Sequence, residues 1–343
     1  MTPNTTGPVL LRCDVGPRTG VGHLMRCLAL AEELRDRGED RVELVREQLC
    51  SRDIPWVAPP VSPDDHRGLV ARLGASLVVV DSYELPGPVY AALHDTGVPV
   101  LAIVDGPPGD RVADVYVNAN LGAEGTPRGL APGTTYLGGL DYALMRREVR
   151  AARRDTHREP DPLRPRALAF FGGTDPFGAA PVVTRAMVET RLPFEATVVA
   201  GSPALAGAVG AVAVRPGQRV TAVPPTPRLV DLVGGADVVL SAAGTSTWEL
   251  MCLGVATGLV CVVDNQRPGY AAVTGHGSVL GLGELDDLRD GPSPGLARLL
   301  SDPDLRQDLR RRARRLVDGH GVERVADAAL HLTTRAIAPR RAP

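Results

Sequence analysis

The stretch from Pro8 to Leu34, PVLLRCDVGPRTGVGHLMRCLALAEEL, has the pattern of a strand, a glycine-rich turn and a helix. Its beginning, Pro8–Cys13, is an apolar run of the kind found in buried strands, and the run ends at Asp14. Beyond the turn, apolar side chains recur at helical spacing, at Leu24, Leu28, Ala31 and Leu34. The sequence therefore predicts a strand–turn–helix unit with a histidine, His23, at the start of its helix.

Short apolar runs separated by segments of helix length continue along the chain. In the first half they lie at 41–45, 76–83, 98–106 and 113–120. The pattern restarts with ALAFFGGTDP at 167–176, which predicts a strand followed by a glycine turn. Further strands are predicted in EATVVAGS at 195–202, at the start of ADVVLSAAGTSTWELMCLG at 236–254, and in TGLVCVVDNQ at 257–266. Near-continuous apolar strands of this kind are typical of a parallel sheet covered by helices on both faces. The fold class that we expect is α/β, with two Rossmann-like domains.

The length of 343 residues suits two domains of about 150 residues each. A polar, proline-rich stretch, RRDTHREPDPLRPR at 153–166, is the best candidate for a linker. We therefore expect an N-terminal domain over 1–158 that carries His23. The C-terminal domain is expected over 165–335, with a helical tail at 305–332. Because both halves present polar strand ends, we also expect a ligand-binding cleft.

Charge and composition exclude several classes of partner. The net charge is −2, so neither nucleic acid nor an anionic membrane surface is expected as a partner. The basic run RRRARR at 310–315 is flanked by leucines at helical spacing, which favours a solvated helix face. The five cysteines form no CxxC pair, as is typical of reduced thiols in a cytoplasm.

The expected location is cytoplasmic. No apolar run reaches the roughly 18–20 residues that span a bilayer, so no membrane span is expected. The N-terminus lacks the basic and apolar regions of a signal peptide. The sequence does not indicate an oligomeric state.

Polar residues gather where the predicted strands end, and ligands of parallel sheets bind at that edge. In the first half these residues are Asp14, Gly20, Gly22, His23, Asp81, Tyr83 and Asp105. In the second half they are Gly172, Gly173, Thr174, Asp175, Ser241, Gly244, Thr245, Ser246, Glu249, Asn265 and Gln266. Each also has a structural interpretation: Asp81 and Asp105 as helix caps, for example, or His23 as a satisfied core histidine. Their repetition in both halves favours a binding site.

Two glycine-rich turns open onto predicted helices, at Gly172–Thr174 and at Ala243–Ser246. Their backbone N–H groups are suited to a diphosphate. The turn after the first strand lacks the GxGxxG pattern of dinucleotide-binding domains, and no GxxxxGK[ST] motif occurs in the chain. The motifs therefore argue against a P-loop kinase.

Three segments together resemble a known family: TGVGHLMRCLALAEEL at 19–34, FFGGTDP at 170–176, and ADVVLSAAGTSTWELMCLGVATGLVCVVDNQ at 236–266. They are similar to the nucleotide-sugar hydrolases of pseudaminic acid biosynthesis, which remove UDP from a 2,4-diacetamido-2,4,6-trideoxy-altropyranose, and to spore-coat polysaccharide proteins. The resemblance covers roughly residues 8–285. It implies a GT-B-like fold, the fold of a superfamily that also includes the lipid II N-acetylglucosaminyltransferase.

The resemblance also implies roles for individual residues. It makes His23, in the family's G-x-GH motif, catalytic, with Tyr83 and Asp14 beside it. For the nucleotide and diphosphate it implies Gly172, Gly173, Thr174, Ser241, Gly244, Thr245, Ser246 and Glu249, the last on the ribose hydroxyls. For the sugar it implies Gly22, Asp105, Asn265 and Gln266. The family often has two consecutive aspartates where this chain has Asp105–Gly106, so one carboxylate is missing near the sugar.

The function expected first is hydrolysis of a UDP-sugar, an amino or deoxy sugar, at the anomeric carbon. His23 would take a proton from the attacking water, Asp14 would orient the ring or counter its developing charge, and backbone donors would stabilise the leaving diphosphate. This scheme requires no metal and no cofactor. Three alternatives stay open on the same fold. They are a glycosyltransferase acting on a small-molecule acceptor in a specialised biosynthetic pathway, a non-catalytic nucleotide-sugar-binding protein, and a 2-epimerase with His276 as a second histidine.

Overall fold

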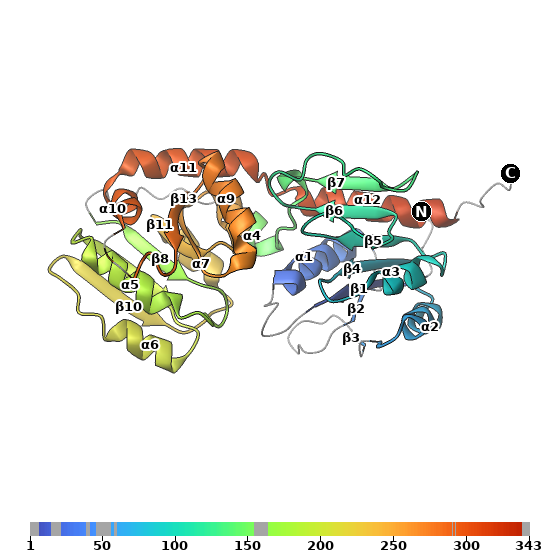
Figure 1. The fold of residues 1–343 in the computed structure, drawn as a ribbon, viewed down its shortest axis with the longest axis horizontal. Coiled ribbons are helices and arrows are strands. Elements are labelled where there is room, and N and C mark those ends of the chain that lie inside the picture. The colour runs from blue at the N-terminus through green and yellow to red at the C-terminus, as the bar shows by residue number, and fades with distance from the viewer. Residues whose placement is uncertain are drawn as a thin grey trace. The chain divides into compact units, whose positions relative to one another are not determined.

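The computed structural model describes residues 7–14, 22–38, 42–45, 56–57, 60–153, 164–289, 291 and 293–337 (Figure 1). The glycine-rich turn at 15–21, the stretch 154–163 within the predicted linker, and Cys50 lie outside these residues. The chain divides into two compact units. The first consists of Met1–Arg147 together with His320–Pro343, and the second of Glu148–Gly319.

The first unit is built on a seven-stranded sheet in the order β3-β2-β1-β4-β5-β6-β7. Its strands are β1 Val9–Cys13, β2 Val42–Val45, β3 Trp56–Val57, β4 Leu77–Asp81, β5 Val100–Ile103, β6 Val115–Asn118 and β7 Thr135–Gly138. Each pair of neighbouring strands is parallel. The chain order reverses between β1 and β4, which makes this the switch point of the sheet, where ligands of open α/β sheets bind.

Helices cover both faces of this sheet (Figure 1). Helices α1 (Gly22–Asp36) and α12 (Gly321–Ile337) share one core with β1, β4, β5 and β6. Helices α2 (Pro63–Leu73) and α3 (Gly87–His94) form a second core on the other side. Along β4, Val79 packs in the first core and Val78 in the second. This two-sided burial explains why the strand is a continuous apolar run in the sequence.

The C-terminal helix α12 belongs to the first unit, whereas the sequence pattern placed it in a domain over 165–335. Its buried stripe packs in the same core as α1, through Val322, Val325, Ala326 and Ala329. Arg37, after the end of α1, adds an ion pair with Asp327 and a hydrogen bond to the carbonyl of Glu323. The sequence pattern could not assign this helix to a domain. An apolar stripe shows that one face of a helix is buried, but it does not show which core buries that face.

The second unit holds a six-stranded parallel sheet in the order β10-β9-β8-β11-β12-β13, with its switch point between β8 and β11. Its strands are β8 Arg166–Phe170, β9 Phe194–Val199, β10 Gln218–Val223, β11 Val238–Ala242, β12 Ala256–Cys261 and β13 Leu280–Glu284. Its main helices are α5 Ala179–Glu189, α6 Pro203–Gly210, α7 Leu229–Gly234, α8 Ser246–Leu253, α9 Arg267–His276, α10 Pro294–Ser301 and α11 Pro303–Leu316. The short helix α4, Arg147–Ala152, lies at the boundary of the units.

The arginine side chains of α11 face solvent only in part, both in the basic run at 310–315 and before it. Arg311 is exposed and pairs with Asp308 of the same helix at 2.6 Å, as expected of a solvated face. Arg306, by contrast, is 3% exposed, and its Nη1 donates to two carbonyls at the end of α10. Part of the basic character of α11 therefore serves to join two helices.

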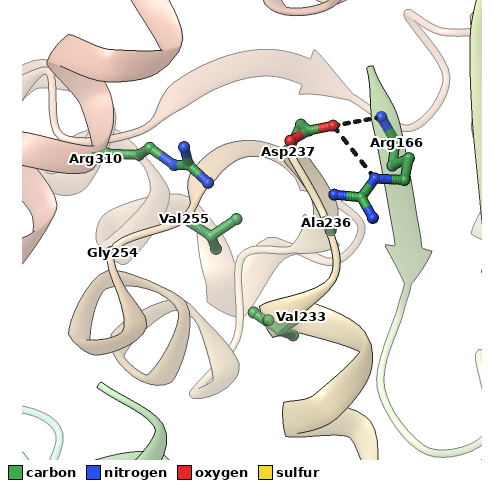
Figure 2. A pocket seen from close by; sticks show the side chains of 8 residues that line it. Arg166, Val233, Ala236, Asp237, Gly254, Val255 and Arg310 are labelled. Carbon is green, nitrogen blue, oxygen red and sulfur yellow. Dashed lines mark hydrogen bonds and ion pairs between the residues drawn. The ribbon is translucent and has the colours of Figure 1, made fainter. Parts of the chain in front are cut away.

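A small hollow lies at the amino-terminal edge of the second sheet (Figure 2). Asp237 accepts a hydrogen bond from the backbone N–H of Arg166 at 2.8 Å, and its carboxylate lies 3.6 Å from the guanidinium Nε of the same residue. Arg310 and Gly254 also line the hollow. Because ligands of parallel sheets bind at the carboxyl edge, this feature joins β8 to β11 and is not the candidate site.

Candidate active site

His23 and Asp81 form a buried pair at the switch point of the first sheet. His23 is the second residue of α1, and Asp81 is the last residue of β4, opposite Cys13 of the neighbouring β1. Nδ1 of His23 lies 2.5 Å from Oδ1 of Asp81. A carboxylate can only accept a hydrogen bond, so Nδ1 carries the hydrogen. Nε2 then has the free lone pair and can accept a proton from a ligand.

Arg26 lies three residues after His23 on α1 and binds two carboxylates. Its Nε and Nη2 donate to Asp81, at 2.5 and 2.6 Å. Its Nη1 and Nη2 donate to Asp105 at 2.8 and 3.0 Å. Although burial alone would lower the pKa of Arg26, the two carboxylates raise that pKa well above its usual value. Arg26 is therefore a fixed positive charge beside the histidine.

Asp105 follows β5, and all of its contacts are with other side chains of the site. Besides the two bonds from Arg26, Oδ1 accepts from Nδ2 of Asn120 at 3.0 Å, and Oδ2 accepts from the hydroxyl of Tyr83. Burial opposes ionisation, but these partners hold the pKa of Asp105 well below its usual range. Asp105 therefore organises its neighbours, and its oxygens already have four donors.

Tyr83 presents its ring beside His23. The two rings are perpendicular, with centroids 4.4 Å apart, and Tyr83 remains 53% exposed. Burial of the hydroxyl and the nearby Asp105 raise the pKa of Tyr83 well above its usual value. The hydroxyl is therefore a hydrogen-bond donor at physiological pH and is unsuited to act as a base.

The hydrogen bond of the His23 ring goes to Asp81 and not to Asp14, which was predicted to orient the ring or counter its charge. Its carboxylate accepts from Ser82 Oγ at 2.8 Å, from the N–H of Tyr83 at 2.7 Å and from the N–H of Glu84 at 3.2 Å. Asp81 occupies the expected position behind the histidine. The reason is the register of the sheet: Asp81 ends β4 within the strand, whereas Asp14 lies one residue beyond β1 and turns toward the next loop.

In the second unit, the glycine turn at Gly172–Thr174 follows β8 and is exposed. The next residue, Asp175, is buried with a φ of 45°, and its carboxylate accepts from the N–H groups of Ala179 and Ala180 at 2.8 Å each. The amino end of α5 therefore already carries an anion of its own. The backbone of the turn itself stays available to a ligand.

The amino end of α8 differs from that of α5. Thr245 precedes the helix and makes no side-chain cap hydrogen bond. Ser241, Gly244 and Ser246 lie in or beside the same turn, and Glu249 is in the first turn of α8, half-buried. An uncapped helix terminus of this kind favours an anion.

Gln266 reaches the α8 turn from the segment after β12. Its Oε1 accepts from the N–H of Val262 at 3.1 Å, and its Nε2 lies 3.9 Å from where a Cβ on Gly244 would be. Asn265 is exposed beside it. The structure therefore brings Gln266 of the β12 loop beside Gly244 of the α8 turn.

Arg26 and Asn120 were not predicted, and Asp81 was named among the polar strand ends, with a helix cap as its alternative, but was given no role beside His23. For Arg26 a signal existed. It lies three residues after His23, on the same helix face, and is the one charged residue in the apolar run LMRCLALA at 24–31, where a charged side chain indicates a buried partner. Asn120 carries no comparable signal.

Two further findings concern the part of the chain that the structure describes. There, no three His, Cys, Asp or Glu side chains gather closely enough to hold a metal ion. Among those same residues, no helix has the length and apolar character needed to cross a bilayer.

No protein-family model and no curated protein matches the sequence. Solved structures do resemble the whole chain. MurG of Acinetobacter baumannii superposes with a TM-score of 0.69 at 17% identity, over 94% of this chain and 99% of MurG. CalG4, the calicheamicin glycosyltransferase, gives 0.64 at 17% identity, over 96% and 99%. MnaA of S. aureus, solved with UDP, gives 0.63 at 12% identity, over 97% and 98%.

These structures and the two parallel sheets show that the chain has a GT-B-like fold with two Rossmann-like domains, as predicted. His23 and Asp81 stand at the switch point of the first of the two sheets.

Proposed function

We propose that this chain is a glycosyltransferase that moves a sugar from a nucleoside diphosphate to a hydroxyl or amine of a small acceptor. The observation that carries the proposal is the His23–Asp81 pair, in which a buried carboxylate fixes Nδ1 and leaves Nε2 as the proton acceptor. The shared fold adds support, because CalG4 is a glycosyltransferase by name and MnaA was solved with UDP.

In the proposed reaction, the acceptor hydroxyl gives its proton to Nε2 of His23 while its oxygen attacks the anomeric carbon. The bond between that carbon and the diphosphate oxygen breaks, and the nucleoside diphosphate leaves with the bonding electrons. Asp81 stabilises the imidazolium that forms. A single displacement of this kind inverts the anomeric configuration.

The leaving diphosphate gains negative charge, and the second unit has backbone donors for it. The amino end of α8 is the preferred place, through the N–H groups of Thr245 and Ser246, because the N–H of Gly244 already donates to the carbonyl of Ala242 and the first N–H groups of α5 already bind Asp175. The exposed turn at Gly172–Thr174 offers further donors. Glu249 is proposed for the ribose hydroxyls, and Asn265 and Gln266 for the sugar and phosphates.

The first unit offers the sugar or the acceptor a different kind of surface. The half-exposed ring of Tyr83 lies against His23 and gives an apolar face to a sugar ring. Asp105 acts on this face through Arg26 and Tyr83, since its own oxygens are occupied. Gly22 is the first residue of α1 and directly precedes the histidine, and we propose it for the sugar.

Hydrolysis is the second candidate, and the motif resemblance at 19–34, 170–176 and 236–266 favours it. The same base would then activate water in place of an acceptor hydroxyl. The nucleotide sites of the two reactions are equivalent, so they differ only in what Nε2 of His23 deprotonates.

Incubation with a panel of UDP- and dTDP-sugars, with and without small-molecule acceptors, separates the two reactions. A glycosyltransferase releases nucleoside diphosphate only when an acceptor is present and forms a glycosylated product. A hydrolase releases it at the same rate without acceptor and, in ¹⁸O-water, labels the free sugar. Binding of UDP without release in any mixture would overturn both candidates in favour of a non-catalytic binding protein.

A further inference from the structure

Arg26 and His23 converge on the same oxygen. Nη2 of Arg26 lies 2.6 Å from Oδ1 of Asp81, and Nδ1 of His23 lies 2.5 Å from that atom. The two nitrogens are 3.2 Å apart. Both carry hydrogen, so their closeness reflects a shared acceptor and not a hydrogen bond between them. The guanidinium of Arg26 and the carboxylate of Asp81 therefore both lie next to Nδ1 of the His23 ring.

These charges act on the ring with opposite sign. A carboxylate beside an imidazole favours the protonated ring, whereas a guanidinium at this distance opposes protonation. Asp81 is fully buried and the Arg26 side chain is 13% exposed, so water screens neither charge strongly. With Arg26 present, the carboxylate behind His23 is already neutralised.

We propose that Arg26 is a positioning residue for His23. It holds Asp81 in the orientation that accepts from Nδ1, and its positive charge opposes the charge of that carboxylate beside the ring. Its effect on catalysis rests on the proposed function, because a neutral ring with a free Nε2 is what the transfer reaction requires. Its effect on the ring does not depend on which reaction the protein catalyses.

The other groups near His23 do not reverse this balance. The hydroxyl of Tyr83 is protonated, because burial and Asp105 raise its pKa. A hydrogen bond to a neighbouring thiol, together with burial, raises the pKa of Cys27, which is therefore neutral 3.9 Å from Asp81. Among the other charged groups of the described residues, Asp105 contacts Arg26 and not the ring. Asp14 is held by Ser82 and the backbone of Tyr83, and it pairs with Arg12 at 3.2 Å.

The test is an NMR titration of the His23 ring, with its signals assigned by their loss in His23→Asn. In Arg26→Gln the titration midpoint should rise by about one to two pH units, because the neighbouring positive charge is gone. In Arg26→Lys, which keeps the charge and guards against a misfolded first variant, the midpoint should stay within about half a unit of wild type. An unmoved midpoint in folded Arg26→Gln would falsify the inference.

Asp105→Asn supplies a control of opposite sign. It leaves Arg26 in place and removes the second carboxylate that partly neutralises it, so the His23 midpoint should fall. If Arg26 had a purely structural role, the His23 midpoints of Arg26→Gln and Asp105→Asn would not shift in opposite directions. Midpoints that move in the same direction in Arg26→Gln and Asp105→Asn would overturn the inference.

The activity readout is the pH profile of kcat/KM with a nucleotide sugar that the wild type turns over. The acidic limb of Arg26→Gln should move to higher pH with the NMR midpoint, the loss should fall on kcat, and the KM for the nucleotide sugar should change less than about threefold. If the acidic limb of the kcat/KM profile stays in place in Arg26→Gln while the rate falls at every pH, Arg26 does not act on catalysis through the ring of His23. If the wild type turns over no nucleotide sugar but the midpoints move as expected, the inference stands and the proposed function fails.

Discussion

Asp14 accepts a hydrogen bond from the backbone N–H of Tyr83 at 2.7 Å, so the strand end of β1 fixes the loop that follows β4. The same carboxylate accepts from Ser82 Oγ and from the N–H of Glu84, and it is 4% exposed. Asp14 therefore shapes the surroundings of His23 by holding the chain that carries Tyr83.

We expect Asp14→Ala to lower the free energy of unfolding by about 2–4 kcal/mol, because it leaves several buried donors without an acceptor. Chemical denaturation measures this change. The matched control is Asp64→Ala, which removes an exposed carboxylate paired with Arg67 on α2 and should change stability by less than about 0.5 kcal/mol. A fully stable Asp14→Ala protein that has lost its turnover would instead give Asp14 a part in the chemistry.

Replacement of His23 tests the proposed base directly. His23→Ala should lose roughly 10²–10⁴-fold in kcat, the usual worth of a positioned proton acceptor. Binding of UDP, measured by calorimetry, should be nearly unchanged, since the nucleotide residues are proposed in the second unit. His94→Ala, in α3, is the control and should keep its rate. Full activity of His23→Ala would remove the base from the mechanism while leaving the fold as it is.

The sequence predicted the central strands of both sheets well and missed the outer ones. The strands without a prediction are β3, β7, β10 and β13, and each lies at the edge of its sheet. Central strands are buried on both faces and appear as apolar runs. An edge strand such as β10 alternates between buried and exposed residues and has no such run.

The candidate site could be predicted only to the level of strand ends. His23 and Tyr83 were identified, and the structure brings their rings together. The partner of His23 was assigned to Asp14 instead of Asp81, because both follow apolar strands and only strand register distinguishes them. The hydrogen bonds of Arg26 depend on three elements meeting, which spacing along the chain does not reveal.

The hydroxyl of Tyr83 should be dispensable for proton transfer. It donates to Asp105, which keeps Arg26 and Asn120 as partners without it. Tyr83→Phe should therefore lower kcat/KM by less than about tenfold, or about 1.4 kcal/mol, because the remaining partners keep Asp105 in place. Tyr83→Ala removes the ring that packs on His23 and should lose more. Loss in Tyr83→Phe as large as in His23→Ala would show that the hydroxyl takes part in the chemistry.

Asp105 makes the stability of the protein depend on pH in a defined direction. Despite burial, which acts the other way, Arg26 and the other donors hold the pKa of Asp105 below its usual range. A depressed pKa means that the stabilisation is complete above the unfolded-state pKa of about 4 and is lost as the pH falls further. The stability difference between wild type and Asp105→Asn should therefore be constant from pH 7 to about pH 5 and shrink below about pH 4. Urea denaturation across this range measures it, and a difference that persists undiminished to the lowest pH would contradict the assignment.

Gly244 tests where the diphosphate binds. Its φ is ordinary for any residue, and a Cβ there would meet nothing closer than Nε2 of Gln266 at 3.9 Å, so Gly244→Ala should fold with wild-type stability. The added methyl would stand between the uncapped end of α8 and an approaching phosphate. We expect calorimetry to show UDP binding weakened about tenfold, or about 1.4 kcal/mol.

Gly234→Ala is the matched control for Gly244→Ala. Gly234 also has an ordinary φ and open space around its Cβ position, but it lies at the end of α7 beside the hollow at the opposite edge of the same sheet (Figure 2). Its UDP affinity should equal that of the wild type. If Gly244→Ala also binds UDP as tightly as the wild type, the diphosphate is not held at α8. The exposed turn at Gly172–Thr174 then becomes the place to test, since the amino end of α5 is already occupied by Asp175.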